Sequence, residues 1–142
     1  TSSGTILFIN DNNADATNND ANGKIVAMQR VEIVTSDSNN DDDSGGDLVF
    51  MVKPEAANLT ERLRMDSVGQ ILPGADNTQN LGSSSKRWKN IYSADLHCSN
   101  KGSKNDVDGT WGDYTIQEGE SDLFLINNRS GKKYKFNLTE VN

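Results

Sequence analysis

Short apolar runs alternate with long polar stretches in the first third of the chain. Residues 4–9 and 25–34 are rich in β-branched and aromatic side chains, a composition that favours strands. Residues 10–22 and 36–47 consist mostly of Asn, Asp and other small residues, so we predict two long loops. A third apolar run covers residues 48–52 and is closed by a nearby proline. The pattern predicts an antiparallel unit of three strands with polar excursions.

A hairpin is predicted next, over residues 59–72. Its turn falls at Ser67-Val68-Gly69-Gln70, where glycine supports a tight reversal. A helix over residues 55–65 is the alternative, because several residues there are tolerable helix formers. We favour the hairpin, whose apolar side would consist of Leu59, Leu63, Met65, Val68, Ile71 and Leu72.

A short helical turn is expected near residues 84–92, with a serine as its N-cap. Trp88 and Tyr92 lie four residues apart, so on a helical turn their rings would share one side. Core packing is the preferred role for this pair, and a sugar-binding platform is the alternative.

The C-terminal part is typical of a β meander. Apolar and alternating runs cover residues 114–117, 122–127 and 132–138, and the turns between them contain Gly and Asn or Ser. In the last run, Tyr134 and every second residue after it are apolar, while their neighbours are Lys or Asn. This is the clearest amphipathic strand in the sequence.

These patterns divide the chain into three parts. Residues 1–98 form a β region, residues 99–110 form a polar linker, and residues 111–142 form a small C-terminal β-meander domain. The fold class is therefore mainly β.

The composition indicates that the chain shares a core with identical neighbours. Only 33% of its 142 residues are hydrophobic, which is little for a small domain that already buries a modest share of its surface. Disorder is the alternative explanation, but the compact apolar runs oppose it. Oligomerisation is a common remedy for a thin core, so we expect a symmetric homo-oligomer.

The charge excludes some partners. The formal net charge is −7, whereas binding of nucleic acid relies on clustered Lys and Arg. No apolar run approaches the roughly 20 residues that span a bilayer, so we expect no membrane insertion. Cys98 is the single cysteine, which rules out an intrachain disulfide. The chain starts at Thr1 without a signal peptide, so we expect a fragment of a longer protein or a processed product.

Candidate chemistry in the sequence is weak. The Asp- and Asn-rich loops invite a calcium hypothesis, but the best EF-hand frame, from Asn18, ends at Gln29 where a glutamate is required. Paired carboxylates for glycoside hydrolysis are not flanked by aromatic platforms. His97 and Cys98 are adjacent, and adjacent residues on a strand point to opposite faces. We therefore expect no catalytic residue, no metal and no cofactor.

Several ordered motifs resemble segments of bacteriophage tail fibres and tailspikes. Residues 81–96 read LGSSSKRWKNIYSADL, similar to the "LGSSSxRWxxIYSADL" element near the C-terminal end of trimeric fibres. Residues 59–73 resemble their "LTERMRIDSSGNVLP" unit, and residues 46–53 resemble their "GGDLVFxTK" strand. The resemblance covers roughly residues 46–98. The C-terminal part is similar to a domain in fibre proteins of phages that infect marine bacteria.

The resemblance implies an intertwined or side-by-side trimeric β fibre or tip. The chain would be a non-enzymatic virion structural protein, the distal part of a tail fibre or tailspike that attaches to the host cell. Its partners would be itself, other virion proteins and a host glycan or protein receptor. The trimer-core candidates are Leu48, Phe50, Leu63, Met65, Trp88 and Tyr92. The receptor-contact candidates are Lys86, Arg87, Trp111 and Tyr114.

Four alternatives remain open. The chain could be a capsid decoration or another virion fibre, a fragment of a polysaccharide-depolymerising tailspike, or a carbohydrate-binding module. Some similar fibres also end in a chaperone that is released by self-cleavage before a serine in an "SDxRLK"-like motif. Here Ser99 and Lys104 match that motif, but Asn100 replaces its Asp and the Arg-Leu pair is missing.

Overall fold

The computed structural model describes residues 2–10, 25–34, 45–55 and 57–141. The two long polar loops and the EF-hand-like frame predicted in them lie almost entirely outside these residues. Strands are the regular elements of the described residues, and no helix occurs among them. The chain divides into two compact units, residues 1–81 and residues 82–142, each built on one antiparallel sheet.

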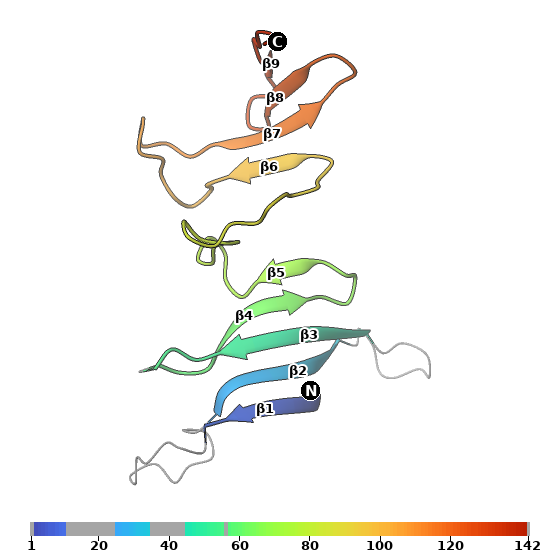
Figure 1. The fold of residues 1–142 in the computed structure, drawn as a ribbon, viewed down its shortest axis with the longest axis vertical. Coiled ribbons are helices and arrows are strands. Elements are labelled where there is room, and N and C mark those ends of the chain that lie inside the picture. The colour runs from blue at the N-terminus through green and yellow to red at the C-terminus, as the bar shows by residue number, and fades with distance from the viewer. Residues whose placement is uncertain (1, 11–24, 35–44, 56, 142) are drawn as a thin grey trace. The chain divides into compact units, whose positions relative to one another are not determined.

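The first unit is a five-stranded meander in which every strand pairs with the next one along the chain (Figure 1). Its strands are β1 (Ser2–Ile9), β2 (Ile25–Val34), β3 (Gly45–Val52), β4 (Thr60–Met65) and β5 (Ile71–Pro73). The predicted three-strand unit and the predicted hairpin are both confirmed. The expected apolar side of the hairpin is wrong at Leu72, which pairs with Arg64 and therefore lies on the other face from Leu63 and Met65. Asp66 closes the hairpin, because its carboxylate accepts hydrogen bonds from the backbone N–H groups of Val68 and Gln70.

The register places most apolar side chains of this sheet on one face, although Leu7, Met28 and Met51 form an apolar row on the other. Residues directly opposite each other on antiparallel strands share a face, and so do alternate residues along a strand. We call this the apolar face. It contains three cross-strand rows: Phe8–Ala27–Val52, Ile6–Gln29–Phe50–Leu63–Pro73 and Val31–Leu48–Met65–Ile71.

The opposite face, which we call the charged face, has a small core of its own. Val49 is 0% exposed, although the sheet is a single layer. It pairs with Arg30 on one side and Arg64 on the other. The aliphatic stems of these arginines flank Val49, since long cationic side chains cover apolar surface while their charged ends stay near water.

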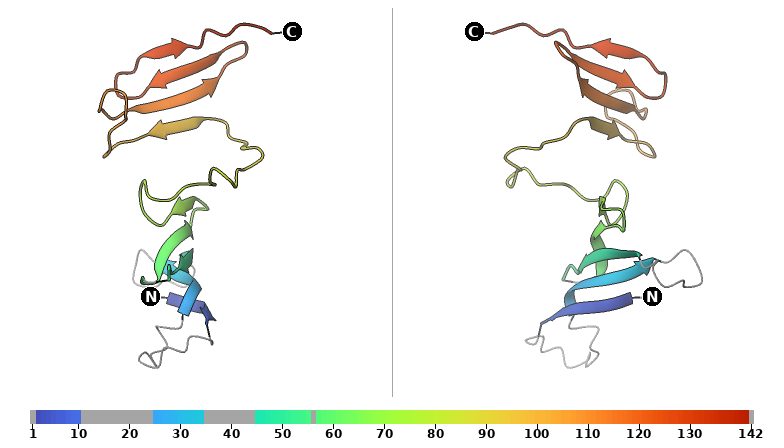
Figure 2. Two further views of the ribbon diagram at one scale, coloured as in Figure 1. Left: turned by 60° about the vertical axis from the view of Figure 1, so that its left-hand side comes forward. Right: turned by 90° about the vertical axis from the view of Figure 1, so that its right-hand side faces the viewer.

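The second unit is a four-stranded meander (Figure 2). Its strands are β6 (Leu96–Ser99), β7 (Asp113–Glu118), β8 (Leu123–Asn127) and β9 (Lys133–Lys135). The predicted C-terminal meander is confirmed as β7, β8 and β9. One face of the sheet carries Leu96, Ile116, Leu125 and Tyr134, which lie in one cross-strand row.

Three expectations differ from the structure. The helical turn predicted near residues 84–92 is wrong, because residues 82–95 form bends and irregular backbone with no helix. The alternative helix over residues 55–65 is excluded by β4. The expected domain boundary after residue 98 also differs, because β6 pairs with β7 and therefore belongs to the C-terminal sheet. Residues 99–110 thus connect two neighbouring strands of one sheet.

Candidate interface and receptor-contact residues

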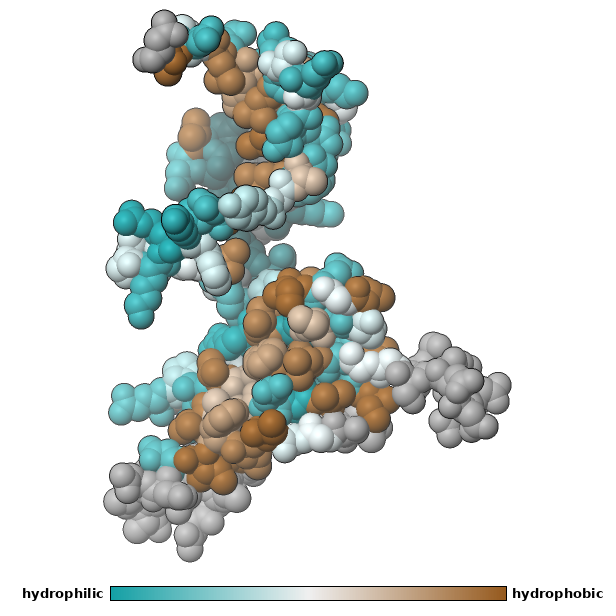
Figure 3. Space-filling view, turned by 45° about the vertical axis from the view of Figure 1, so that its right-hand side comes forward, coloured by the Kyte–Doolittle hydropathy of each residue, from teal (hydrophilic) through white to brown (hydrophobic). Residues whose placement is uncertain are grey.

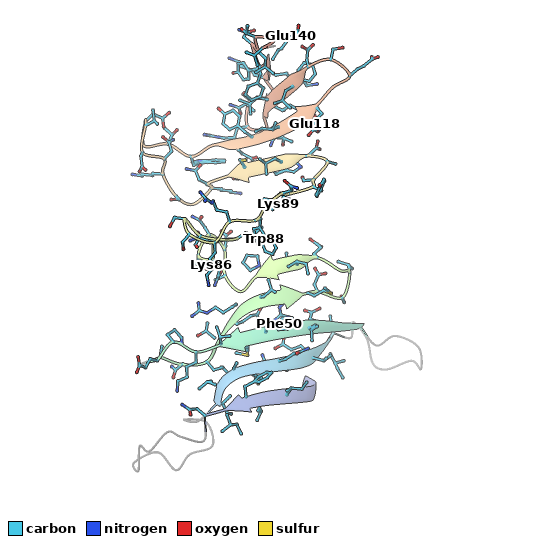
Figure 4. The ribbon with its side chains drawn as sticks, viewed as in Figure 1. Phe50, Lys86, Trp88, Lys89, Glu118 and Glu140 are labelled. Carbon is cyan, nitrogen blue, oxygen red and sulfur yellow. The ribbon has the colours of Figure 1, made fainter. Side chains whose placement is uncertain are left out.

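Four of the six trimer-core candidates lie on the apolar face. Leu48 and Phe50 are on β3, and Leu63 and Met65 are opposite them on β4. Phe50, Leu63 and Met65 are 36%, 40% and 41% exposed, so the chain itself leaves them largely uncovered. Figure 3 shows apolar side chains gathered over the N-terminal sheet, and Figure 4 labels Phe50 within it. A monomer ordinarily exposes apolar residues singly, whereas these side chains form one continuous surface, which is typical of an interaction site.

The charged face is organised around one arginine that the sequence analysis did not single out. The Arg64 guanidinium donates to carboxylate oxygens of Glu61 (2.7 Å), Asp47 (2.5 Å) and Glu32 (2.8 Å). Glu32 also pairs with Arg30. The five members of this cluster come from three neighbouring strands, so their ion pairs join β2, β3 and β4.

The cluster shifts the pKa of Glu32 and of Arg64. The hydrogen bond from Arg64 is the largest influence on Glu32, and together with Arg30 it lowers the pKa of that carboxyl below its ordinary value. The hydrogen bonds to Glu61, Asp47 and Glu32 raise the pKa of Arg64 above its ordinary value. Arg64 stays charged, so it favours the ionised form of the Glu32 carboxyl.

The two aromatic trimer-core candidates lie on the irregular segment 82–94. Trp88 is 63% exposed and Tyr92 is 92% exposed, so neither ring packs into the core of its own chain. The segment begins with a tight turn, in which Ser83 N–H donates to Lys86 O (2.8 Å) and Lys86 N–H donates to the Ser83 hydroxyl (3.0 Å). Gly82 allows this turn because its φ is +90°, a conformation that side chains disfavour.

Two receptor-contact candidates, Lys86 and Arg87, are exposed on the same segment. Together with Gly82 and Trp88 they line a shallow hollow, and Figure 4 shows Lys86, Trp88 and Lys89 on this stretch of backbone. Segment 82–94 has three cationic residues and no acidic residue. It therefore offers positive charge and an open aromatic ring at one place.

The other two receptor-contact candidates, Trp111 and Tyr114, are held by contacts within the chain. The Arg129 guanidinium lies 3.9 Å from the centre of the Trp111 ring and donates to the Trp111 carbonyl oxygen (2.7 Å). The Tyr114 hydroxyl accepts a hydrogen bond from the Asn127 amide (3.0 Å). Both aromatic rings are half-buried. Their observed role is to fix the β8–β9 turn against the start of β7.

The residues considered for nucleophilic chemistry form a structural network. His97 Nδ1 lies 3.0 Å from the hydroxyl of buried Thr115, which also accepts a hydrogen bond from Asn128 (3.0 Å). Cys98 is exposed and pairs with Tyr114, so it lies on the face of β6 opposite to His97. The Ser99 hydroxyl donates to the Gly112 carbonyl oxygen. No cysteine–histidine pair is assembled here.

The described residues contain no group of three or more His, Cys, Asp or Glu side chains that could hold a metal ion. Nor is any helix among them long and apolar enough to cross a membrane. The exposed carboxylate of Asp108 accepts hydrogen bonds from Thr110 and Asn105. These bonds lower the pKa of Asp108, and the one from the Thr110 backbone N–H has the largest effect. These bonds stabilise the 100–110 loop.

No protein-family model, curated protein or solved structure matches this chain.

Proposed function

We propose that this chain is a non-enzymatic virion structural protein, the distal part of a phage tail fibre or tailspike, which assembles as a homotrimer and attaches to the host cell. The apolar face of the N-terminal sheet is the observation that carries the proposal. Its exposed side chains need a cover, and no segment of the described chain supplies one. The motifs in residues 46–98 that resemble phage fibres add support.

The exposed side chains of the apolar face support association. Ile6, Phe8, Phe50, Leu63, Met65 and Ile71 all lie on this face and are each at least 36% exposed. A contiguous apolar surface of this kind is typical of a site that another protein covers.

The two faces of the N-terminal sheet suit a trimer with a dry interior. The apolar faces of three copies would meet around an axis, and the charged faces with Arg30 and Arg64 would remain toward water. Trp88 and Tyr92 would pack against neighbouring copies. Burial at about 25 cal/mol per Å² of apolar surface provides the driving force.

Attachment would use the exposed cationic segment. Segment 82–94 contains Lys86, Arg87 and Lys89 and no acidic residue, which suits an anionic glycan on the cell surface. Three copies on one tip would bind with avidity, because linked weak sites act together. Loops on a rigid scaffold commonly carry such contacts.

Molar mass in solution tests the assembly. Light scattering on the purified chain is expected to give about three times 15.5 kDa, with resistance to detergent on the same sample. A folded monomer would overturn the trimer, and a carbohydrate-binding module would then be the better explanation.

Adsorption tests the attachment. The fluorescently labelled chain is mixed with intact cells of a panel of marine bacteria, and bound fluorescence is measured. A Lys86→Glu, Arg87→Glu double variant should bind fewer cells. The control is a Lys101→Glu, Lys104→Glu double variant, which reverses two exposed cations of the 100–110 loop. Release of reducing sugar from the cell polysaccharide would instead identify a depolymerase.

A further inference from the structure

Gln29 is the one polar side chain in the centre of the apolar face. It lies on β2, where it pairs with Ile6 of β1 and with Phe50 of β3. The same cross-strand row continues to Leu63 of β4. Phe50, labelled in Figure 4, shows where this row crosses the middle of the sheet. Ala27 and Val31, the neighbours of Gln29 on the same face of β2, are apolar as well.

The amide of Gln29 has no hydrogen-bond partner among the described residues of its own chain. It is half-buried, so covering the apolar face would remove the water that now serves it. An amide buried without a partner costs free energy, and buried polar groups are therefore almost always paired. Whatever covers this face must supply both an acceptor and a donor at Gln29.

We infer that the Gln29 side chains of three copies meet at the centre of the trimer and form a closed ring of hydrogen bonds. This inference rests on the proposed trimer. Each amide has two N–H groups that can donate and a carbonyl oxygen that can accept. In a ring around a three-fold axis, one N–H of each copy donates to the carbonyl oxygen of the next, and the second N–H is left to a trapped water.

The ring fixes how the copies align. A slip of one copy along the axis would place the amide against Ile6 or Phe50 and leave it unpaired. A buried asparagine in coiled coils sets register and number of strands in the same way, at some cost in stability. Gln29 is thus the residue that specifies the alignment and the number of copies, while the surrounding apolar side chains supply the binding energy.

A charge at this position tests the inference. In Gln29→Glu, three carboxylates would meet on the axis, where burial and like charge favour their neutral form. The variant should be a trimer at about pH 4 and should dissociate at about pH 8, well above the ordinary glutamate pKa. Light scattering at both pH values measures this. The control is Thr5→Glu, which adds the same charge on the charged face, where Thr5 pairs with Arg30.

The outcomes separate this inference from the proposed trimer. A wild-type chain that is not a trimer overturns both. A trimeric wild type with a Gln29→Glu variant that stays trimeric at pH 8 overturns the ring alone. If Gln29→Glu assembles at neither pH, the oligomeric state of Gln29→Leu decides between the outcomes. Association of Gln29→Leu into a mixture of sizes supports the ring. A pure Gln29→Leu trimer, or a Gln29→Leu chain that no longer associates, overturns it.

Discussion

At the scale of single residues, Arg64 determines whether the charged face holds together. Removing it would leave Glu32, Asp47 and Glu61 close together without their common cation. Breaking a partly buried ion-pair cluster by deleting one member is costly, because the remaining charges stay desolvated. We expect Arg64→Ala to lower the free energy of unfolding by about 2–3 kcal/mol, measured by urea denaturation.

The control for this prediction is the neighbouring arginine. Arg62 is on the same strand and is also half-buried, but it has no ion pair among the described residues. Arg62→Ala should therefore cost less than 1 kcal/mol, the range of an exposed charge. Equal losses in both variants would mean that the arginine stems, rather than the carboxylate cluster, stabilise the sheet.

Acid should weaken the same cluster. The pKa of Glu32 is lower in the folded chain than its ordinary value of 4.5, because of the hydrogen bond from Arg64. A carboxyl with a lowered folded pKa contributes stability that is fully present above the unfolded pKa and is lost as the pH falls through the folded pKa. The melting temperature should thus fall below about pH 4.5, and the fall should be shallower in Glu32→Gln. An identical acid limb in both chains would contradict the shift.

The residue scale also shows what a sequence can reveal. Leu48, Phe50, Leu63 and Met65 were named together as candidates that the resemblance to phage fibres implies, and the register places all four on one face. The stack of Arg129 on Trp111 was not predictable, since 18 residues separate the partners and only the fold of a turn brings them together. Gln29 is visible in the sequence as a polar residue between Ala27 and Val31, at a position where strand alternation expects an apolar one. Only its pairing with the neighbouring strands shows that it lies at the centre of a face.

At the scale of elements, local hydrogen bonding explains why the predicted helical turn is absent. Ser83 and Lys86 bond to each other and close a tight turn after Gly82. Serine side chains compete with the backbone in this way, which makes them weak helix formers inside a run of three. The hairpin of β4 and β5 was predictable because its local bonding favours the expected turn. The Asp66 carboxylate accepts a backbone hydrogen bond in this turn, and Gly69 adopts the positive φ that the turn requires.

The strand β6 was harder to recognise. Its four residues, Leu96 to Ser99, are too few to show an alternation, and all four are exposed. Its pairing with β7 bridges a polar loop that reads as a linker in the sequence. The internal bonds of Asn105, Asp108 and Thr110 give this loop a defined turn, and polar composition alone does not reveal them.

Truncating Trp88 tests the role of segment 82–94. If the ring packs against neighbouring copies, Trp88→Ala should weaken the assembly by about 3 kcal/mol per chain and reduce its resistance to detergent. If the ring is instead a sugar platform, the trimer should persist while the labelled chain binds fewer cells. Val107→Ala, which truncates an almost fully exposed residue in the 100–110 loop, should change neither property.

At the scale of the whole molecule, the two faces of the N-terminal sheet should respond differently to the same substitution. Leu63 lies on the apolar face and Leu72 on the charged face, where it pairs with Arg64. The two leucines are 40% and 37% exposed, so they are matched in residue type and in burial within one chain. In the proposed trimer, only Leu63 would be covered by the neighbouring copies.

Leu63→Asp should therefore dissociate the trimer, because each buried carboxylate would lose its hydration without gaining a partner. Leu72→Asp should remain a trimer, since its carboxylate would lie near Arg64 and remain in water. Light scattering at neutral pH measures both. Dissociation of both variants would point to a general loss of folding, and persistence of both would show that the apolar face is not the interface. Dissociation of Leu63→Asp alone would mean that the thin core of one chain is completed by its neighbours through this face.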